Sequence, residues 1–391
     1  MRKKKEDNNN LIKFAATTFD VTEYRYNKGT QLISWGKDNI SVPKSLLAFY
    51  NSEGKSLHKS LINKKVKFIA GNGLHKAKQK QLQEIIGTSD LDKEIKKATF
   101  DFELFNGFAF EVIKNKAGEL HSIKHIPFHK LRLKTLESEP EEVDDTLIWF
   151  SHDWENKYKQ RNVPVSIPLF DNKIKHSKSI FYYSEYNPET DGLYPIPSYS
   201  QCLRWINLAH KISVFHYNQV HNGYSPSMVI SFNNGMPSPE VQQQNYDDLN
   251  DMFAGETNSG GVFITYSSGI ENKPQLIPVQ LNDSDKRFLL LNEQITDEVI
   301  SAHEIPPALV KLEAGKLAST DERRELNEEF QYSYVDDRQH TLESAINEIL
   351  VSFGIDEKVK LKTYKDARAQ TNDLNNKDVE DSGIIQTDAK I

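Results

Sequence analysis

The stretch Ile295–Phe330, ITDEVISAHEIPPALVKLEAGKLASTDERRELNEEF, joins two helical patterns through a break. Before the break, apolar residues recur at spacings of three and four, which predicts an amphipathic helix that begins near Asp283. Pro306 and Pro307 should end this helix, because proline lacks an N–H and restrains the residue before it. A short loop containing lysine and glycine then leads into a heavily charged segment.

The second helical pattern is long. Ser319 and Glu322 have the spacing of a capping box, in which each side chain satisfies a backbone N–H at the helix start. Apolar positions continue to Phe353, and Gly354 is a suitable end because glycine adopts positive φ at little cost. At about 1.5 Å per residue this helix could reach about 50 Å. Residues 355–391 are polar and are expected to form a short, largely disordered tail.

The first half of the chain predicts an α+β fold. Residues 1–32 are polar and are expected to form a flexible arm. Apolar residues at helical spacing follow between Leu57 and Ile69, and the sequence GNG at residues 71–73 should stop that helix. Residues 92–133 predict a helix that leads into a β-hairpin. The segments TLIWFS and SIFYYS add further strands up to about residue 190.

A small insert separates two helices in the middle of the chain. Residues 199–220 predict the first helix, and the segment SMVISF predicts a strand after it. Ser238 and Pro239 suit the start of a short helix that reaches about Phe253. The segments GVFITYS and PQLIPVQ predict two more strands. The predicted order of elements in the insert is therefore strand, helix, strand, strand (β-α-β-β).

Length and composition limit the possible functions. The chain has 391 residues, of which 37% are hydrophobic, and a net charge of -7. This is enough for two or three domains, and the acidic balance indicates no general affinity for nucleic acid. The single Cys202 excludes an intramolecular disulfide and a cysteine-based zinc site. No window approaches 18 apolar residues and the N-terminus lacks a signal-peptide pattern, so a soluble intracellular product is expected.

The segments EGKS and AGKL resemble part of a phosphate-binding loop. Such a loop needs a glycine five residues before its Gly-Lys, so that backbone amides can surround the phosphates. Phe49 and Val310 occupy those positions. Solvated turns are therefore the better interpretation of both segments.

Other candidate catalytic and metal-binding patterns also fail. His121, His125 and His129 recur every four residues, but on a strand such residues lie about 13 Å apart, too far to share one metal. GYSPS around Ser225 lacks the second glycine of a nucleophile elbow. Paired carboxylates such as Asp336 and Asp337 are typical of a solvated helix face. We therefore predict no catalytic residue, no metal site and no cofactor.

Four segments carry a family resemblance. The segment from Ser34 contains W-G-x-D-N and closes with G-x-G-L at residues 71–74, and FELFNGFAFEVIKNKAGELHSIKHIPFHKLRL forms a hydrophobic hairpin. GLYPIPSYS enters the first central helix, which leaves through N-G-x-x-P, and ISAHEIPPALV precedes the loop. In this order, over about residues 33–353, the segments resemble the portal proteins of tailed bacteriophages.

The resemblance implies a portal fold with a reduced or absent crown, since little chain follows Phe353. The implied parts are a wing (33–197), a first stem helix (198–225), a clip (226–281), a second stem helix (282–305), a tunnel loop (306–319) and a long helix on the wing or crown side (320–354). The double proline would end the second stem helix inside a ring. The long helix would then carry the chain back outward.

The resemblance also implies a function in the virion. A portal forms a ring, implied here to have twelve subunits, at one capsid vertex. The terminase large subunit packages double-stranded DNA through its channel, the genome is later ejected through it, and the tail connector docks on it. Further implied partners are the major capsid and scaffold proteins and a head-completion adaptor, with no membrane. Assembly would take place in the host cytoplasm, and ATP hydrolysis would belong to the terminase.

The tunnel loop supplies the candidate site residues. By the resemblance, residues 309–318 project into the channel, and Lys311, Leu312, Glu313, Gly315 and Lys316 would line it. An acidic channel lining would repel the duplex and keep its contacts with the protein weak. Lys311 and Lys316 would be the exceptions and would form a loose basic ring. Ordinary solvation of an exposed loop explains the same two lysines equally well.

Two alternatives of other classes stay open from the sequence alone. An α+β enzyme with an unfamiliar active site would show a polar cluster in a pocket and exist as a monomer or dimer. Another ring-forming virion component, such as a head–tail adaptor, would be smaller and would lack the order of helix, insert, helix and loop.

Overall fold

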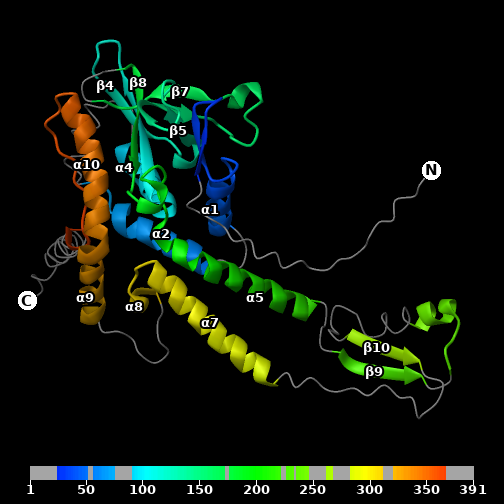
Figure 1. The fold of residues 1–391 in the computed structure, drawn as a ribbon. Coiled ribbons are helices and arrows are strands. Elements are labelled where there is room, and N and C mark those ends of the chain that lie inside the picture. Colours follow the sequence, from blue (N-terminus) through cyan, green and yellow to red (C-terminus); the bar gives the residue numbers. More distant parts are fainter. Residues whose placement is uncertain are drawn as a thin grey trace, which may run out of the picture.

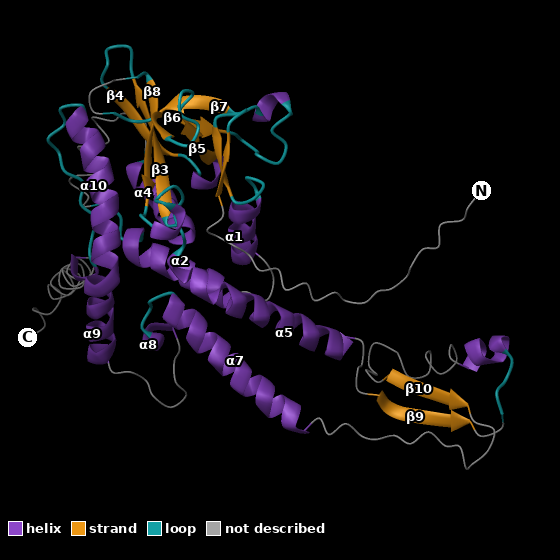
Figure 2. Cartoon of the chain, viewed as in Figure 1, coloured by secondary structure: helices purple, strands orange, loops and turns teal. Residues whose placement is uncertain are grey.

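The computed structural model describes residues 24–51, 56–74, 90–171, 176–221, 226–232, 235–245, 261–266, 282–310 and 320–366. A body of sheets and helices forms one end of the molecule, and two long helices extend from its base (Figure 1). A pair of strands lies beyond the far ends of these helices. Figure 2 shows that the helices lie beneath and beside the two sheets of the body.

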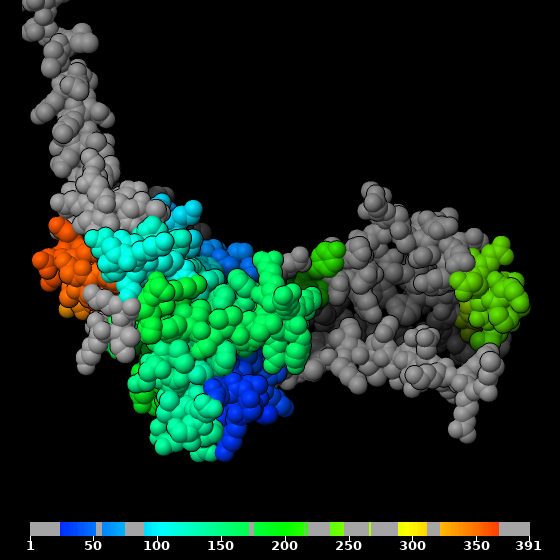
Figure 3. Space-filling view, turned by 90° about the horizontal axis from the view of Figure 1, so that it is seen from above, coloured from blue at the N-terminus to red at the C-terminus, as the bar shows by residue number. Residues whose placement is uncertain are grey.

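A five-stranded antiparallel sheet forms one part of the body. Its order is β1 (Tyr24–Asn27), β2 (Leu32–Trp35), β5 (Leu131–Thr135), β6 (Val143–Phe150) and β7 (Val165–Pro168). The expectation of a flexible arm over residues 1–32 is wrong for residues 24–32, which form β1, the turn after it and the first residue of β2, while residues 1–23 lie outside the described residues. Tyr24 and Tyr26 explain the difference, because both rings pack against the core. In the space-filling view the blue N-terminal part of the body lies against its green part (Figure 3).

A three-stranded antiparallel sheet forms the other part of the body. Its order is β4 (Leu120–His125), β3 (Gly107–Lys114) and β8 (Lys178–Ser184). Helix α4 (Leu91–Phe105) leads into β3 through Asn106, whose φ of 63° turns the chain. The predicted helix and hairpin are thus confirmed. The segments TLIWFS and SIFYYS are strands as predicted, in β6 and β8, but they belong to different sheets.

Two helices, α1 (Ser41–Asn51) and α2 (Ser56–Ala70), lie at the base of the body. The predicted stop after α2 is confirmed. The N–H of Gly71 donates to the carbonyl of Lys67 at 2.9 Å, and Gly73 has a φ of 64°. A side chain at Gly71 would place its Cβ 2.1 Å from that carbonyl oxygen, so the close approach requires glycine.

The two long helices are α5 (Leu203–His221), entered through a 3₁₀ turn at Ser198–Cys202, and α7 (Asn282–Ala302). Helix α7 ends four residues before Pro306, so the prediction that the prolines end it is wrong. Its end is set by Glu304, which has a left-handed φ of 57°. Pro307 instead begins the short helix α8 (Pro307–Val310), because a missing N–H is tolerated at a first helical position.

The insert between α5 and α7 contains β9 (Pro226–Phe232) and β10 (Gly261–Tyr266), which pair in parallel. Residues 239–245 are helical, in agreement with the predicted start at Ser238, whose carbonyl accepts from the N–H of Gln242 at 3.0 Å. The predicted extension to Phe253 and the predicted strand PQLIPVQ lie outside the described residues.

The long final helix is confirmed as one run from Thr320 to Ser352, made of α9 (Thr320–Phe330), a π-helical turn (Gln331–Val335) and α10 (Asp336–Ser352). Gly354, with a φ of 73°, stops it as predicted. The expectation of a largely disordered tail is wrong for residues 355–366. There Val359 and Leu361 are buried, and the N–H of Lys362 donates to the carbonyl of Gly73 at 3.0 Å. Residues 367–391 lie outside the described residues.

Candidate functional site

The loop that carries the candidate residues Lys311, Leu312, Glu313, Gly315 and Lys316 lies outside the described residues, so their role stays a prediction. The structure does describe both of its ends. Helix α8 precedes the loop and contacts α7 and α9, and α9 follows it. The junction of α7, α8 and α9 with the body therefore positions this loop.

Buried aromatic and imidazole rings hold the turn that follows α7, at His303, on the body. His303 is fully buried, and its Nε2 lies 3.0 Å from Nδ1 of His58 on α2. The ring of Tyr199 stacks on His303 with centroids 5.1 Å apart. The Tyr199 hydroxyl donates to the carbonyl of Leu104 at 2.6 Å. Through these contacts the end of α7 is attached to both α2 and α4.

A second contact holds the start of the loop. The Lys64 ammonium on α2 donates to the carbonyl of Leu309 in α8. Burial lowers the pKa of Lys64, and the nearby charges of Arg323 and Lys67 lower it further. One side of this junction is hollow, with a volume of about 470 Å³ lined in part by Asp297, Glu304 and Glu329. The chain on both sides of the loop is thus anchored beside an acidic hollow.

His303 and His129 have lowered pKa values in the folded protein and are neutral there at pH 7. Burial, followed by the charges of Lys65 and His58, holds the pKa of His303 well below its ordinary value of 6.5. Burial also lowers the pKa of His129 to about 4, against the opposing effect of Asp101. The unfolded chain therefore binds more protons than the folded chain between pH 6.5 and about pH 4.

We expect the free energy of unfolding to fall as the pH falls through this window. At pH 5.5 His129, with its pKa of about 4, should remove about 1 kcal/mol relative to pH 7.5, since one pKa unit corresponds to about 1.4 kcal/mol, and His303 should act in the same direction. Urea denaturation at the two pH values measures the change. His129→Gln, which cannot take up the proton, should show a smaller pH dependence. An equal free energy at both pH values would contradict the assignment.

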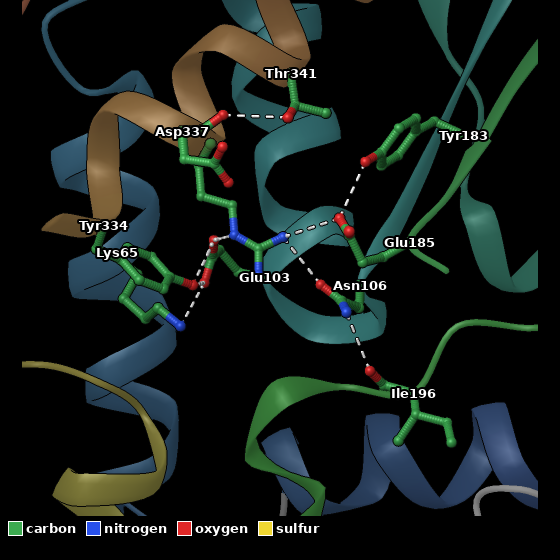
Figure 4. Close-up of polar contacts among 10 residues, drawn as sticks. Lys65, Glu103, Asn106, Tyr183, Glu185, Ile196, Tyr334, Asp337 and Thr341 are labelled. Atoms are coloured by element: carbon green, nitrogen blue, oxygen red, sulfur yellow. Dashed lines mark hydrogen bonds and ion pairs between the residues drawn. The ribbon is translucent and has the colours of Figure 1, made fainter. Parts of the chain in front are cut away.

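A buried polar hub centred on Glu103 joins the long helix to the body (Figure 4). Its carboxylate lies 2.8 Å from the Lys65 ammonium of α2 and accepts from the Tyr334 hydroxyl at 2.9 Å. Arg338 of α10 lies 3.9 Å from the same carboxylate and donates to Asn106 Oδ1 at 2.9 Å. The side chains of Lys65 and Glu103 are each 1% exposed. The hub therefore ties α2, α4, the π-helical turn and α10 together.

The charges of the hub are set by their surroundings. Burial alone would lower the pKa of Arg338, but Tyr334, Glu103 and Glu185 outweigh it, so the pKa is raised and the guanidinium stays charged. Burial and the charge of Glu103 raise the pKa of Tyr334 well above 10, so its hydroxyl stays a donor. Every member has a partner of suitable charge, as a buried ionic network requires. The arrangement is suited to holding elements together.

Two other residues considered in the sequence analysis, His125 and Cys202, have structural roles. His125 lies 2.7 Å from Asp101, whose carboxylate also accepts from the N–H of Phe128 at 2.8 Å. Cys202 is buried, and burial raises the pKa of its thiol to about 12. Within the described ranges, no three His, Cys, Asp or Glu side chains are placed to share a metal ion. No helix in the same ranges is long and apolar enough to cross a membrane.

The sequence reasoning missed the hub. Glu103 lies inside the run FDFELFNGFAF, where carboxylates among aromatic residues are the signal that could have found it. Its partners could not be found in the same way. Arg338 lies more than two hundred residues away and looks like any other charge on an acidic helix.

Comparison with known proteins agrees with this architecture. The family model described as phage portal protein matches residues 93–382. Two solved structures, the virion of a native gene transfer agent particle and the neck of an empty one computed with C6 symmetry, share the fold with TM-scores of 0.55 and 0.54. Each is 13% identical and covers 88% of this chain and 90% of its own. The neck of a native particle computed with C12 symmetry has a TM-score of 0.51 at 11% identity. This match covers 85% of this chain and 87% of the other. No curated protein matches.

The family model covers well over half of the chain, so this chain belongs to the phage portal protein family. The resemblance inferred from the four segments is thereby confirmed. Members of this family are structural components of the virion and connect head to tail, and the chain is not an enzyme. The α+β fold class is confirmed in the same broad sense by the mixture of helices and sheets.

Proposed function

We propose that this chain assembles into a ring of twelve copies that forms the DNA channel at one capsid vertex. In this proposal the two-sheet body and its helices are the wing, α5 and α7 are the stem, and the strand pair β9–β10 belongs to the clip. Residues 306–319, which include the short helix α8, form the tunnel loop, with Lys311 and Lys316 facing the channel. The C12 symmetry of one similar neck structure supports the count of twelve.

The exposed apolar side chains of the stem carry the proposal. Tyr217 on α5 is 65% exposed, and Leu289 and Leu290 on α7 are 65% and 66% exposed. Helices that stand away from a body and expose such residues need a further partner, because large exposed apolar side chains mark interaction surfaces. A neighbouring stem provides that partner in every copy of a ring.

The charges of the two stem helices are complementary. The sequence of α5 contains Arg204 and Lys211 and no carboxylate. From residue 288 to its end, α7 contains Glu293, Asp297 and Glu298 and no lysine or arginine. A ring is closed by head-to-tail contacts between two different surfaces, so α5 of one copy can face α7 of the next.

The same geometry suits the passage of DNA. The net charge of -7 and the acidic hollow beside α8 repel phosphates, which keeps contacts with a moving duplex weak. In this proposal the terminase large subunit packages the genome through the ring, and the genome leaves through it at ejection. The capsid and scaffold proteins surround the wing, and the head-completion adaptor docks on the clip after assembly in the host cytoplasm.

We expect purified protein to form particles of about a dozen copies with a central hole, measured by light scattering and negative-stain class averages. The double variant Leu289→Asp/Leu290→Asp should remain monomeric, because it puts charge into the apolar stem contact. Val351→Asp is the matched control, since Val351 is also an exposed apolar residue, 61% exposed, but lies on α10. A compact dimer of the natural sequence, or rings of the double variant, would contradict the proposal.

A further inference from the structure

We propose that two loops at opposite ends of β6 bind each other between neighbouring copies of this chain. The first is a basic loop, residues 157–163, between β6 and β7. The second is an acidic loop, residues 137–145, which begins between β5 and β6 and runs into the first residues of β6. The inference rests on the ring proposed above and names a contact in its wing.

The basic loop presents a protein-binding surface. It reads KYKQRNV, and its Tyr158 is 88% exposed, with the Lys157 ammonium 5.5 Å from the ring centroid. Lys159 and Arg161 are also exposed. Val163 lies at the end of the same loop and is exposed as well. Tyrosine and arginine beside apolar residues are typical of the residues that dominate binding at protein interfaces.

The basic loop is held in shape by its own base. The Asp153 carboxylate accepts from the N–H of Glu155 at 2.9 Å and from the Asn156 amide at 2.7 Å. Asn156 in turn accepts, through its carbonyl, from the side chain of Asn162 at 3.1 Å, and the carbonyl of Asn162 accepts from the Ser151 hydroxyl at 2.7 Å. A loop that is already ordered loses little conformational entropy when it binds.

The acidic loop has the opposite charge. Its exposed carboxylates are Glu137, Glu139, Glu141, Glu142 and Asp145, and no lysine or arginine stands between residues 135 and 149. A hydrogen bond to Glu139 and the charge of Glu139 raise the pKa of Glu142. Crowded carboxylates of this kind are relieved by a facing cation. Lys28 lies 3.7 Å from Glu141, but both side chains are mostly exposed and the other carboxylates remain open to a partner surface.

A second copy of the chain is the partner that fits both loops. The five residues of β6 after Asp145, where the acidic loop ends, extend about 17 Å at about 3.3 Å per residue, which is beyond the screening length of about 8–10 Å, so the loops do not neutralise each other within one copy. Two different and complementary surfaces are what a head-to-tail ring contact requires. The apolar residues Tyr158 and Val163 favour a protein surface over the phosphates of DNA, which is the competing partner for a basic loop.

Charge reversal with rescue tests the contact on the full chain. The basic-loop variant is Lys157→Glu/Lys159→Glu/Arg161→Glu, and the acidic-loop variant is Glu137→Lys/Glu139→Lys/Glu142→Lys. Each triple variant should raise the protein concentration needed for half-maximal ring formation about tenfold at low salt. The variant that combines all six substitutions should return this concentration to that of the natural sequence. The control Lys93→Glu/Lys96→Glu/Lys124→Glu changes the charge by the same amount at other exposed lysines and should assemble normally. Mass photometry measures assembly, and thermal unfolding confirms that every variant is folded.

The outcomes separate this inference from the ring proposal. Rings of the natural sequence that neither triple variant weakens, or a combined variant that fails to recover, would overturn the inference and leave the ring proposal standing. A natural sequence that never forms rings would overturn both. Weaker binding of a short DNA duplex by the basic-loop variant, with unchanged assembly, would assign the basic loop to nucleic acid and overturn the contact.

Discussion

Glu103→Gln is expected to lower the free energy of unfolding by about 3–5 kcal/mol, because it leaves the buried Lys65 ammonium without its counter-charge. The carboxylate lies 2.8 Å from the Lys65 ammonium, whose side chain is 1% exposed, and 3.9 Å from Arg338, whose side chain is 13% exposed. The glutamine keeps the shape of the side chain, so the loss reports charge rather than a cavity. Urea denaturation followed by circular dichroism measures it.

The pair Lys44–Glu155 is the matched control. Its atoms are 2.9 Å apart, almost the distance in the hub, but its side chains are 63% and 56% exposed. Glu155→Gln should therefore change the free energy of unfolding by no more than about 1 kcal/mol. The double variant Lys65→Met/Glu103→Gln should recover part of the loss, because it removes one unpaired cation. Equal losses for Glu103→Gln and Glu155→Gln would show that burial of the hub is unimportant.

Trp35→Ala is the second large effect, with an expected loss of about 3–5 kcal/mol in the free energy of unfolding. The ring is buried and stacks parallel to Tyr194 with centroids 5.2 Å apart. The rings of Phe105 and Phe128 meet it edge-on. Its removal would leave a cavity where β2, α4 and the chain after β8 meet, so the whole body should loosen.

Trp35→Phe separates the loss of volume from the loss of the indole N–H. That N–H has no hydrogen-bond partner among the described residues, so replacing it should cost only the smaller ring volume, no more than about 2 kcal/mol. Thermal unfolding of the three proteins in the same buffer gives the comparison. A phenylalanine variant as unstable as the alanine variant would mean that the indole forms an essential polar contact.

Local patterns predicted those parts of the fold that local physics controls. The spacing of apolar residues identified α2, α4, α5, α7 and the long final helix, and glycines marked the ends at Gly71 and Gly354. The residues of the motif W-G-x-D-N also act locally, on the turn between β2 and α1. Gly36 and Asn39 have positive φ values of 86° and 67°, and Asp38 accepts from the N–H of Ser41 at 2.7 Å to start α1. These residues act on their near neighbours, so their order along the chain reveals their role.

The ends of elements were predicted less well. Two prolines suggested the end of α7, but the turn at Glu304 comes first, because His303 is drawn into the core against His58 and Tyr199. Residues 355–366 and 24–32 look polar along the chain, yet a few apolar residues in each pack on the body. Burial by a distant surface decided these cases, and composition alone does not report it.

From the sequence alone come the family, the α+β class, the helices α2, α4, α5 and α7 and the long final helix. Only the tertiary structure decides which strands share a sheet, that Glu103 lies between Lys65 and Arg338, and that α2 holds the end of α7. The physical reason is that helix and strand periods follow from contacts within a few residues. A buried charge pair depends on elements more than two hundred residues apart, and many lysines in the sequence could have been its partner.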